Sequence, residues 1–219
     1  APYAKIRNQQ AKAQNHDILI HMPMQPVSNI KIEEGGLTLG LSEAQVNERV
    51  KKAKAIVPNA IGMNNHMGSA ATADTTLMTY LMTTLREQNL FFLDSRTIGK
   101  SVAGKIAKEQ GVRVLDRHVF LDDSDNLADV QRQFQSAIQY ARKHGTAIAI
   151  GHPRPNTVAV LKSGIKNLPD DIQLVGMGSL WRNEKILPPK PFILIFNDIP
   201  APTSVAPFEP IPLLRGVPR

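Results

Sequence analysis

Short apolar blocks alternate with segments of helical periodicity along most of this 219-residue chain. Apolar residues recurring every three or four positions predict helices over 3–14, 43–57, 73–89, 101–111, 127–145 and 156–169. The apolar blocks predict strands over 17–23, 60–69, 90–97, 112–123, 146–153 and 172–180. Such alternation indicates an α/β fold built on a parallel sheet or barrel.

Particular residues mark where these segments begin and end. Ser42 and Gln45 have the spacing of a capping box at the start of the second helix. We expect Gly145 to close the longest helix and Pro23 to end the first strand. The runs "DILI", "LFFL" and "TAIAI" are continuously apolar, which favours parallel strands buried on both faces.

The composition changes towards the end of the chain. Nine of the 16 prolines fall in the last 32 residues. Repeated X-Pro pairs favour extended backbone and exclude helix or a central strand. We therefore expect an α/β domain over 1–185 and a Pro-rich extension over 186–219, in which "FILIF" can pack as an edge strand or bind a partner.

The composition also limits the classes of function. The net charge of +7 suggests an anionic partner, but aromatic residues are only 5% of the chain and the basic residues are dispersed, so we do not expect nucleic-acid binding. Without cysteine, a metal would need His, Asp, Glu or water ligands. No apolar run reaches 18 residues, so we expect no membrane span, and the polar start "APYAKIRNQQAKAQ" lacks the core of a signal peptide.

Imidazoles and carboxylates occupy the ends of five successive predicted strands. Loops at the carboxyl ends of parallel strands converge, and ligands bind there. The residues at these ends are His21, His66, Asp94, Asp122 with Asp123, and His152. One strand-end histidine alone is more simply explained as structural, but five polar ends together favour an active site.

Some of these residues have a competing structural explanation. Asp122 and Asp123 precede a helix and also fit an N-cap. The histidines at 16, 118 and 144 lie before a strand, within a strand and at a helix end, so none is a chemical candidate. Ser179 in "GMGSL" is a weak candidate nucleophile because the chain has no G-x-S-x-G motif.

Imidazoles and carboxylates that converge without cysteine suit a catalytic Zn²⁺, or another divalent metal, with an open position for water. Such a metal activates water and polarises a carbonyl, which is the chemistry of amide or ester hydrolysis. A carboxylate base and an imidazole acid would complete the site.

Five motifs, in chain order, resemble the divergent polysaccharide deacetylase family, a branch of the carbohydrate esterases with the NodB-type barrel. They are "NHDILIHMPMQP", "AIGMNNHMGSAAT", "FFLDSRTIG", "VFLDD" and "AIAIGHPRPNTVAVL". The resemblance covers about residues 1–181. It implies a distorted (β/α)7-8 barrel, a divalent metal, and removal of acetyl groups from a glycan, usually in the periplasm or cell envelope of bacteria.

The resemblance also implies roles for individual residues. His21 stands at the first position of the family's H-x-x-x-H metal pair, but Gln25 stands at the second, so the pair is broken. His66 is then the substitute metal ligand. Asp94 with Arg96 matches the motif that orients the catalytic base, and His152 matches the histidine that acts as general acid or stabilises the oxyanion.

Four polar residues of these motifs remain as candidates for contacting the glycan: Asn64, Asn65, Gln25 and Asp122. The family begins with a strand that ends in an Asp-Asp pair, and no such strand precedes Ala1, so the resemblance implies a barrel that is incomplete at the N-terminus. A non-catalytic glycan-binding or envelope-assembly protein that retains the barrel is the alternative, and the glutamine at a ligand position favours it.

Overall fold

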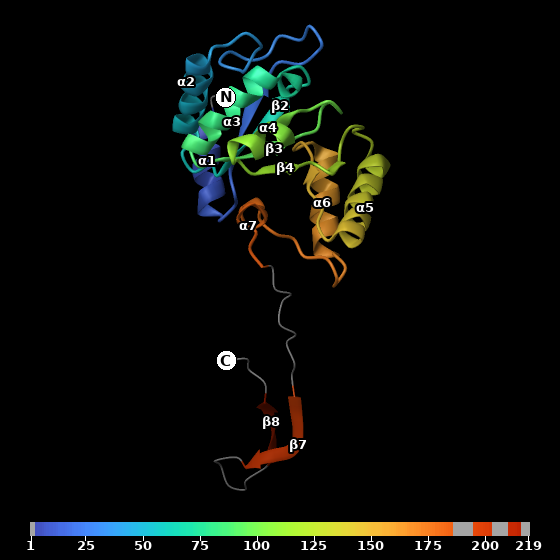
Figure 1. Ribbon diagram of the computed structural model, residues 1–219. Coiled ribbons are helices and arrows are strands. Elements are labelled where there is room, and N and C mark those ends of the chain that lie inside the picture. The colour runs from blue at the N-terminus through green and yellow to red at the C-terminus, as the bar shows by residue number, and fades with distance from the viewer. Residues whose placement is uncertain (1–2, 186–194, 203–209, 216–219) are drawn as a thin grey trace. The chain divides into compact units, whose positions relative to one another are not determined.

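The computed structural model describes residues 3–185, 195–202 and 210–215 (Figure 1). The chain divides into two compact units, Ala1–Glu184 and Lys185–Arg219. The first unit carries every candidate site residue, and the described part of the second is a pair of antiparallel strands.

The first unit follows the alternation of helices and strands expected from the sequence. Its helices are α1 (Ala4–Ala13), α2 (Glu43–Ile56), α3 (Thr75–Glu87), α4 (Ala103–Gln110), α5 (Leu127–His144), α6 (Pro155–Lys166) and α7 (Met177–Arg182), with a 3-10 turn η1 (Ala71–Ala73). Its strands are β1 (Leu19–Met24), β2 (Gly62–Met67), β3 (Phe91–Asp94), β4 (Val114–Asp116), β5 (Val119–Phe120) and β6 (Ala149–Ile150). The capping box of Ser42 and Gln45 is confirmed, and Gly145 closes α5 in the left-handed conformation.

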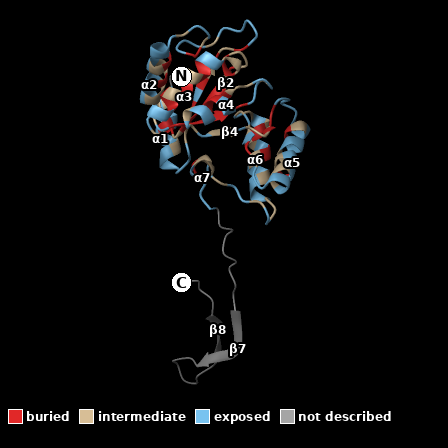
Figure 2. Cartoon of the chain, viewed as in Figure 1, coloured by how far each residue is buried: buried red, intermediate tan, exposed pale blue. Residues whose placement is uncertain are grey.

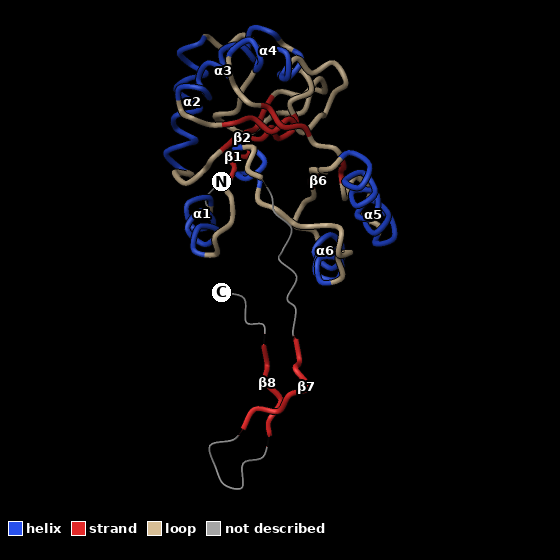
Figure 3. The backbone as a smooth tube through the Cα atoms, turned by 60° about the horizontal axis from the view of Figure 1, so that its bottom comes forward, coloured by secondary structure: helices blue, strands red, loops and turns tan. Residues whose placement is uncertain are grey.

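Strands β1 to β4 form one parallel sheet in the order β1-β2-β3-β4. The helices α2, α3 and α4 connect them in sequence, and in Figure 3 these helices lie on one side of the sheet. This is the arrangement that parallel strands require, because each crossover must return the chain to the same end of the sheet.

Alternation along the strands divides the residues between two faces. Ile20, Met22 and Met24 belong to the main core with α2, α3 and α4. His21, the residue between two of them, therefore faces the opposite side, and the register His21↔Asn64 places Asn64 beside it. Burial is concentrated between the sheet and its helices (Figure 2). The sheet thus has one apolar face and an opposite, polar face, on which His21 and Asn64 lie beside a second apolar cluster that includes Phe91 and Leu93.

The expected barrel is not observed. In the part of the chain that the structure describes, the parallel strands form an open four-stranded sheet and a separate pair, β5-β6. The single strand predicted over 112–123 is wrong because the backbone changes partners within it. The N–H of Arg117 donates to the carbonyl of Asp94 (2.9 Å), whereas the next N–H, of His118, donates to Ile148 (2.8 Å).

Two further expectations need correction. The segment 172–180 contains no strand; it enters α7, where the N–H of Gly178 donates to the carboxylate of Asp17 (2.8 Å). Pro23 does not end β1, which continues to Met24. The carbonyl of Pro23 accepts from Leu37 on the edge away from β2 (2.8 Å), so its missing N–H removes no bond to β2.

The second unit contains the antiparallel strands β7 (Ile195–Pro202) and β8 (Pro210–Arg215). Proline is tolerated there because a two-stranded sheet has only edge strands. The last two residues of "FILIF" begin β7, and the first three lie outside the described residues. Within the described ranges, no helix has both the length and the apolar character needed to cross a bilayer.

Candidate functional site

Two imidazoles meet on the polar face of the sheet. The Nε2 atom of His21 lies 3.2 Å from the Nδ1 atom of His66, and the two rings are edge to face. His21 lies in the middle of β1 rather than at its expected end, whereas His66 is the last residue but one of β2. They nevertheless converge, because the register Pro23↔His66 places His66 on the same face two residues beyond the partner of His21.

An amide network supports the imidazole pair from β3. The Nδ1 atom of His21 lies 2.7 Å from Oδ1 of Asn64, whose Nδ2 donates to the carbonyl of Leu93 (2.8 Å) and to Oγ of Ser95 (2.7 Å). Ser95 in turn donates its hydroxyl to the carbonyl of Asn65 (2.9 Å) and its N–H to the Asn65 side chain (2.8 Å). Both asparagines are buried, so the network faces the protein interior.

The pKa of His21 lies below its ordinary value. Burial of the ring is the largest cause, even though part of the residue remains exposed, and the nearby imidazoles of His66 and His152 act in the same direction. The hydrogen bond with Asn64 and the charge of Glu33 oppose the shift. This shift favours the neutral imidazole near neutral pH.

A second centre lies where β5 and β6 end. The carboxylate of Asp122 is fully buried and accepts from the N–H of His152 (2.6 Å) and the hydroxyl of Thr157 (2.9 Å). Its other oxygen lies 3.0 Å from Nδ1 of His152, whose side chain is 43% exposed. Burial opposes the ionisation of Asp122, but these hydrogen bonds outweigh it, so the pKa of Asp122 is lowered. Asn126 caps α5, so the capping explanation for Asp122 and Asp123 is wrong.

Asp94 and Arg96 are not brought to the imidazole pair. Asp94 is fully buried and accepts from the N–H of Arg96 (2.7 Å) and the hydroxyl of Ser101 (2.6 Å). The Nε atom of Arg96 lies 4.0 Å from Asp116, and the residue has a positive φ of 51°. Asp94 thus stabilises the turn after β3 in this structure.

Sequence reasoning missed Arg117, which links the two centres. Its Nε donates to the carbonyl of Ser95 (2.6 Å), and its guanidinium lies 5.0 Å from the centre of the Phe120 ring. The same Phe120 ring meets His152 edge to face. No motif marked this arginine, because its role depends on the change of sheet partner after β4.

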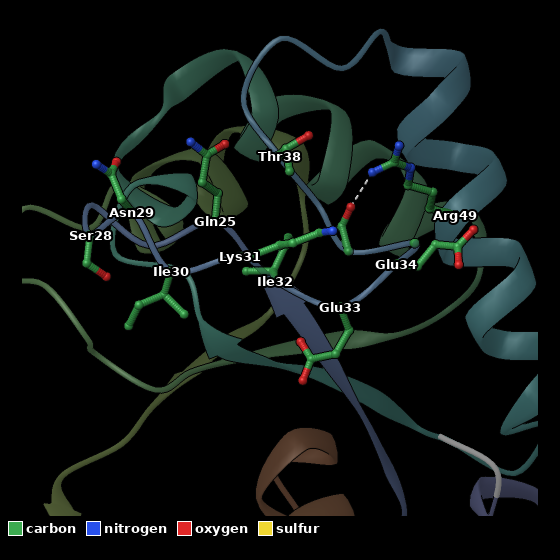
Figure 4. Close-up of a pocket in the computed structure, with 12 residues that line it drawn as sticks. Gln25, Ser28, Asn29, Ile30, Lys31, Ile32, Glu33, Glu34, Thr38 and Arg49 are labelled. Carbon is green, nitrogen blue, oxygen red and sulfur yellow. Dashed lines mark hydrogen bonds between the residues drawn. The ribbon is translucent and has the colours of Figure 1, made fainter.

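Gln25 lies at the edge of a surface hollow of about 550 Å³. The loop over 28–38 forms most of its lining, and Arg49 projects into it from α2 and donates to the carbonyl of Gly36 (Figure 4). The side-chain oxygen of Gln25 accepts from the N–H of Leu39 (2.8 Å), so this glutamine holds the loop rather than facing His21. Glu33 also lines the hollow, and its carboxylate lies 4.0 Å from Nε2 of His66.

The imidazole pair provides part of the ligand set that a divalent metal needs. Two nitrogen ligands at about 2.0–2.1 Å from a tetrahedral Zn²⁺ lie about 3.3 Å apart, and the facing nitrogens of His21 and His66 are 3.2 Å apart. Among the described residues, no group of three or more His, Cys, Asp or Glu side chains converges as a metal site. These residues thus offer two nitrogen ligands to a metal, and its other ligands would be water or substrate.

Two proteins of known sequence are similar to this chain. An uncharacterized protein of Haemophilus influenzae is 76% identical over 219 residues, which cover all of this chain and 78% of that protein. The uncharacterized Escherichia coli protein YibQ is 43% identical over 193 residues, which cover 87% of this chain and 60% of that protein. The chain thus spans only part of either relative.

A solved structure shows the same fold. The crystal structure of an uncharacterized Agrobacterium tumefaciens protein matches with a TM-score of 0.75 at 24% identity, covering 78% of this chain and 71% of that one. Residues 1–181 match the sequence profile described as divergent polysaccharide deacetylase. The chain belongs to the divergent polysaccharide deacetylase family.

Proposed function

We propose that this protein removes acetyl groups from a polysaccharide of the bacterial cell envelope, in a reaction that depends on a divalent metal, most simply Zn²⁺. The main support for this proposal is the convergence of His21 Nε2 and His66 Nδ1, which lie 3.2 Å apart. His152 lies close enough for its charge to lower the pKa of His21, so the second centre belongs to the same electrostatic environment. Family membership supports a glycan as the substrate.

The residues divide the chemistry between them. A divalent ion held by His21 and His66 would polarise the acetyl carbonyl and activate a water molecule. Asp122 holds Nδ1 of His152, whose side chain is 43% exposed, which leaves Nε2 as the ring nitrogen that would serve as a general acid for the departing amine or alcohol. Arg117 holds the two centres in a fixed relative position through its contacts with Ser95 and Phe120.

The hollow beside Gln25 offers room for the sugar. Its volume of about 550 Å³ lies in the range typical of small-ligand sites. Lys31 and Arg49 balance Glu33 and Glu34 among its lining residues, which suits a neutral polar ligand such as an acetylated sugar. Glu33 connects this hollow with the imidazole pair.

A second function is supported by Gln25. Its side chain is committed to Leu39 and stands at the position where the family's usual motif has a histidine. A protein that binds glycan strands without hydrolysing them would need the hollow but not the metal. Release of acetate separates the two functions.

The test is acetate release from acetylated chito-oligosaccharides with and without Zn²⁺, using this chain and the full-length Haemophilus influenzae relative. We expect Zn²⁺-dependent release that is abolished by His21→Ala with His66→Ala and retained in His144→Ala, a control on α5. Glycan binding without release under any divalent metal would favour the binding function. If the protein neither binds the glycan nor releases acetate, both functions are contradicted.

A further inference from the structure

We infer that Asn64 is a positioning residue that fixes the tautomer of His21, so that the Nε2 lone pair of His21 points at His66. This role deepens the proposed function, and the part of it that concerns metal binding rests on that function. Asn64 was expected to contact substrate, but it is only 7% exposed and its amide is engaged with protein groups.

The orientation of the Asn64 amide follows from its neighbours on β3 and just after it. The carbonyl of Leu93 only accepts hydrogen bonds and lies 2.8 Å from Nδ2. The hydroxyl of Ser95 commits its single proton to the carbonyl of Asn65, so towards Asn64 it acts as an acceptor at 2.7 Å. Two acceptors on one side require the NH₂ group there, which leaves the amide oxygen facing His21.

The tautomer of His21 follows in turn. An amide oxygen only accepts, so the ring nitrogen 2.7 Å from it, Nδ1, must carry the proton. The neutral ring has one proton, so Nε2 is left with its lone pair and faces His66 at 3.2 Å. In water a neutral histidine prefers the opposite tautomer, so the protein selects this form.

His66 has a corresponding acceptor on its far side. Its Nε2 lies 4.0 Å from the carboxylate of Glu33, within reach of a bridging water. An anion there favours a proton on Nε2, which frees Nδ1 to face His21. Outer hydrogen-bond partners that set the ring tautomer in this way are typical of metal-binding histidines. When no cation is present, the proton moves to Nδ1 of His66, which then donates to His21.

The tautomer is measured directly from the ring ¹⁵N signals of His21 at about pH 8 in the metal-free chain, with His21→Gln to assign them. We expect protonated Nδ1 and unprotonated Nε2 in the wild type. Asn64→Leu should shift the ring towards the Nε2-protonated form. Asn8→Leu is the control, because Asn8 is also buried (4% exposed) but lies in α1.

Calorimetry with Zn²⁺ alone supplies the second readout. We expect binding to weaken roughly 10- to 100-fold in Asn64→Leu and to remain near the wild-type value in Asn8→Leu. A wild-type His21 protonated on Nε2 would overturn the inference even if Asn64→Leu does not fold. An unchanged tautomer in a folded Asn64→Leu would also overturn it. The expected tautomer without any Zn²⁺ binding would uphold the role of Asn64 and contradict the proposed metal dependence.

Discussion

Replacing Asp122 by asparagine tests whether the buried carboxylate anchors His152. The change keeps the shape of the side chain but removes its charge. Asp122 receives two donors on one oxygen, the His152 N–H (2.6 Å) and the Thr157 hydroxyl (2.9 Å), and contacts Nδ1 of His152 with the other (3.0 Å). Asparagine can retain the first two bonds through its carbonyl oxygen, but it presents NH₂ to the ring.

The magnitude follows from these three bonds. A hydrogen bond to a charged group contributes about 1.5–3 kcal/mol and a neutral one about 0.5–1.5 kcal/mol. Weakening two of these bonds and altering the third would together lower the free energy of unfolding by more than about 2 kcal/mol. Removing the buried charge offsets part of this loss. We therefore expect the free energy of unfolding to fall by about 2 kcal/mol at pH 7.

The loss should depend on pH. The pKa of Asp122 is lower in the folded protein than in the unfolded chain, so its stabilisation is complete above the unfolded pKa of about 3.9 and is lost as pH falls through the folded value. Urea unfolding from pH 7 to pH 3 would measure this, with Asp123→Asn as the exposed neighbouring control. A variant within about 0.5 kcal/mol of the wild type at pH 7, or an equal difference at pH 3, would refute the reasoning.

Two further predictions concern the scaffold around the site. Gly62→Ala places a methyl group 2.7 Å from the ring of Phe91, which is fully buried. We therefore expect the free energy of unfolding, measured by thermal unfolding, to fall by about 1–3 kcal/mol. An unchanged melting temperature would show that the Phe91 ring moves aside without cost. Arg49→Met removes the donor to the carbonyl of Gly36, so amide hydrogen exchange in the loop over 28–38 should accelerate while exchange in α5 stays the same. Equal exchange in both proteins would mean that Arg49 does not hold the loop.

Local signals in the sequence predicted most of the elements correctly. Helix positions followed from apolar periodicity; Ser42 with Gln45 began α2, and Gly145 ended α5, as expected. Pro23 misled the prediction, because whether a proline ends a strand depends on which edge its missing N–H faces. The partner change at Arg117 is a tertiary event that no local pattern encodes.

The candidate site was predicted in outline rather than in detail. Alternation along β1 and β2 was sufficient to bring His21 and His66 together once the register was fixed. Burial decided the rest: Asn64 and Asp122 turn inward to hold imidazoles, although their sequence positions suggested contact with substrate. Sequence alone does not reveal the direction of a side chain in a polar motif.

The most direct test of the central claim is the metal content of the purified chain by plasma mass spectrometry, after loading with Zn²⁺ and removal of excess ion. We expect about one ion per chain in the wild type and in His144→Ala, and none in His21→Ala with His66→Ala, because the two facing nitrogens are then lost. The same content in all three proteins, or no bound ion in any of them, would contradict a metal site at this imidazole pair.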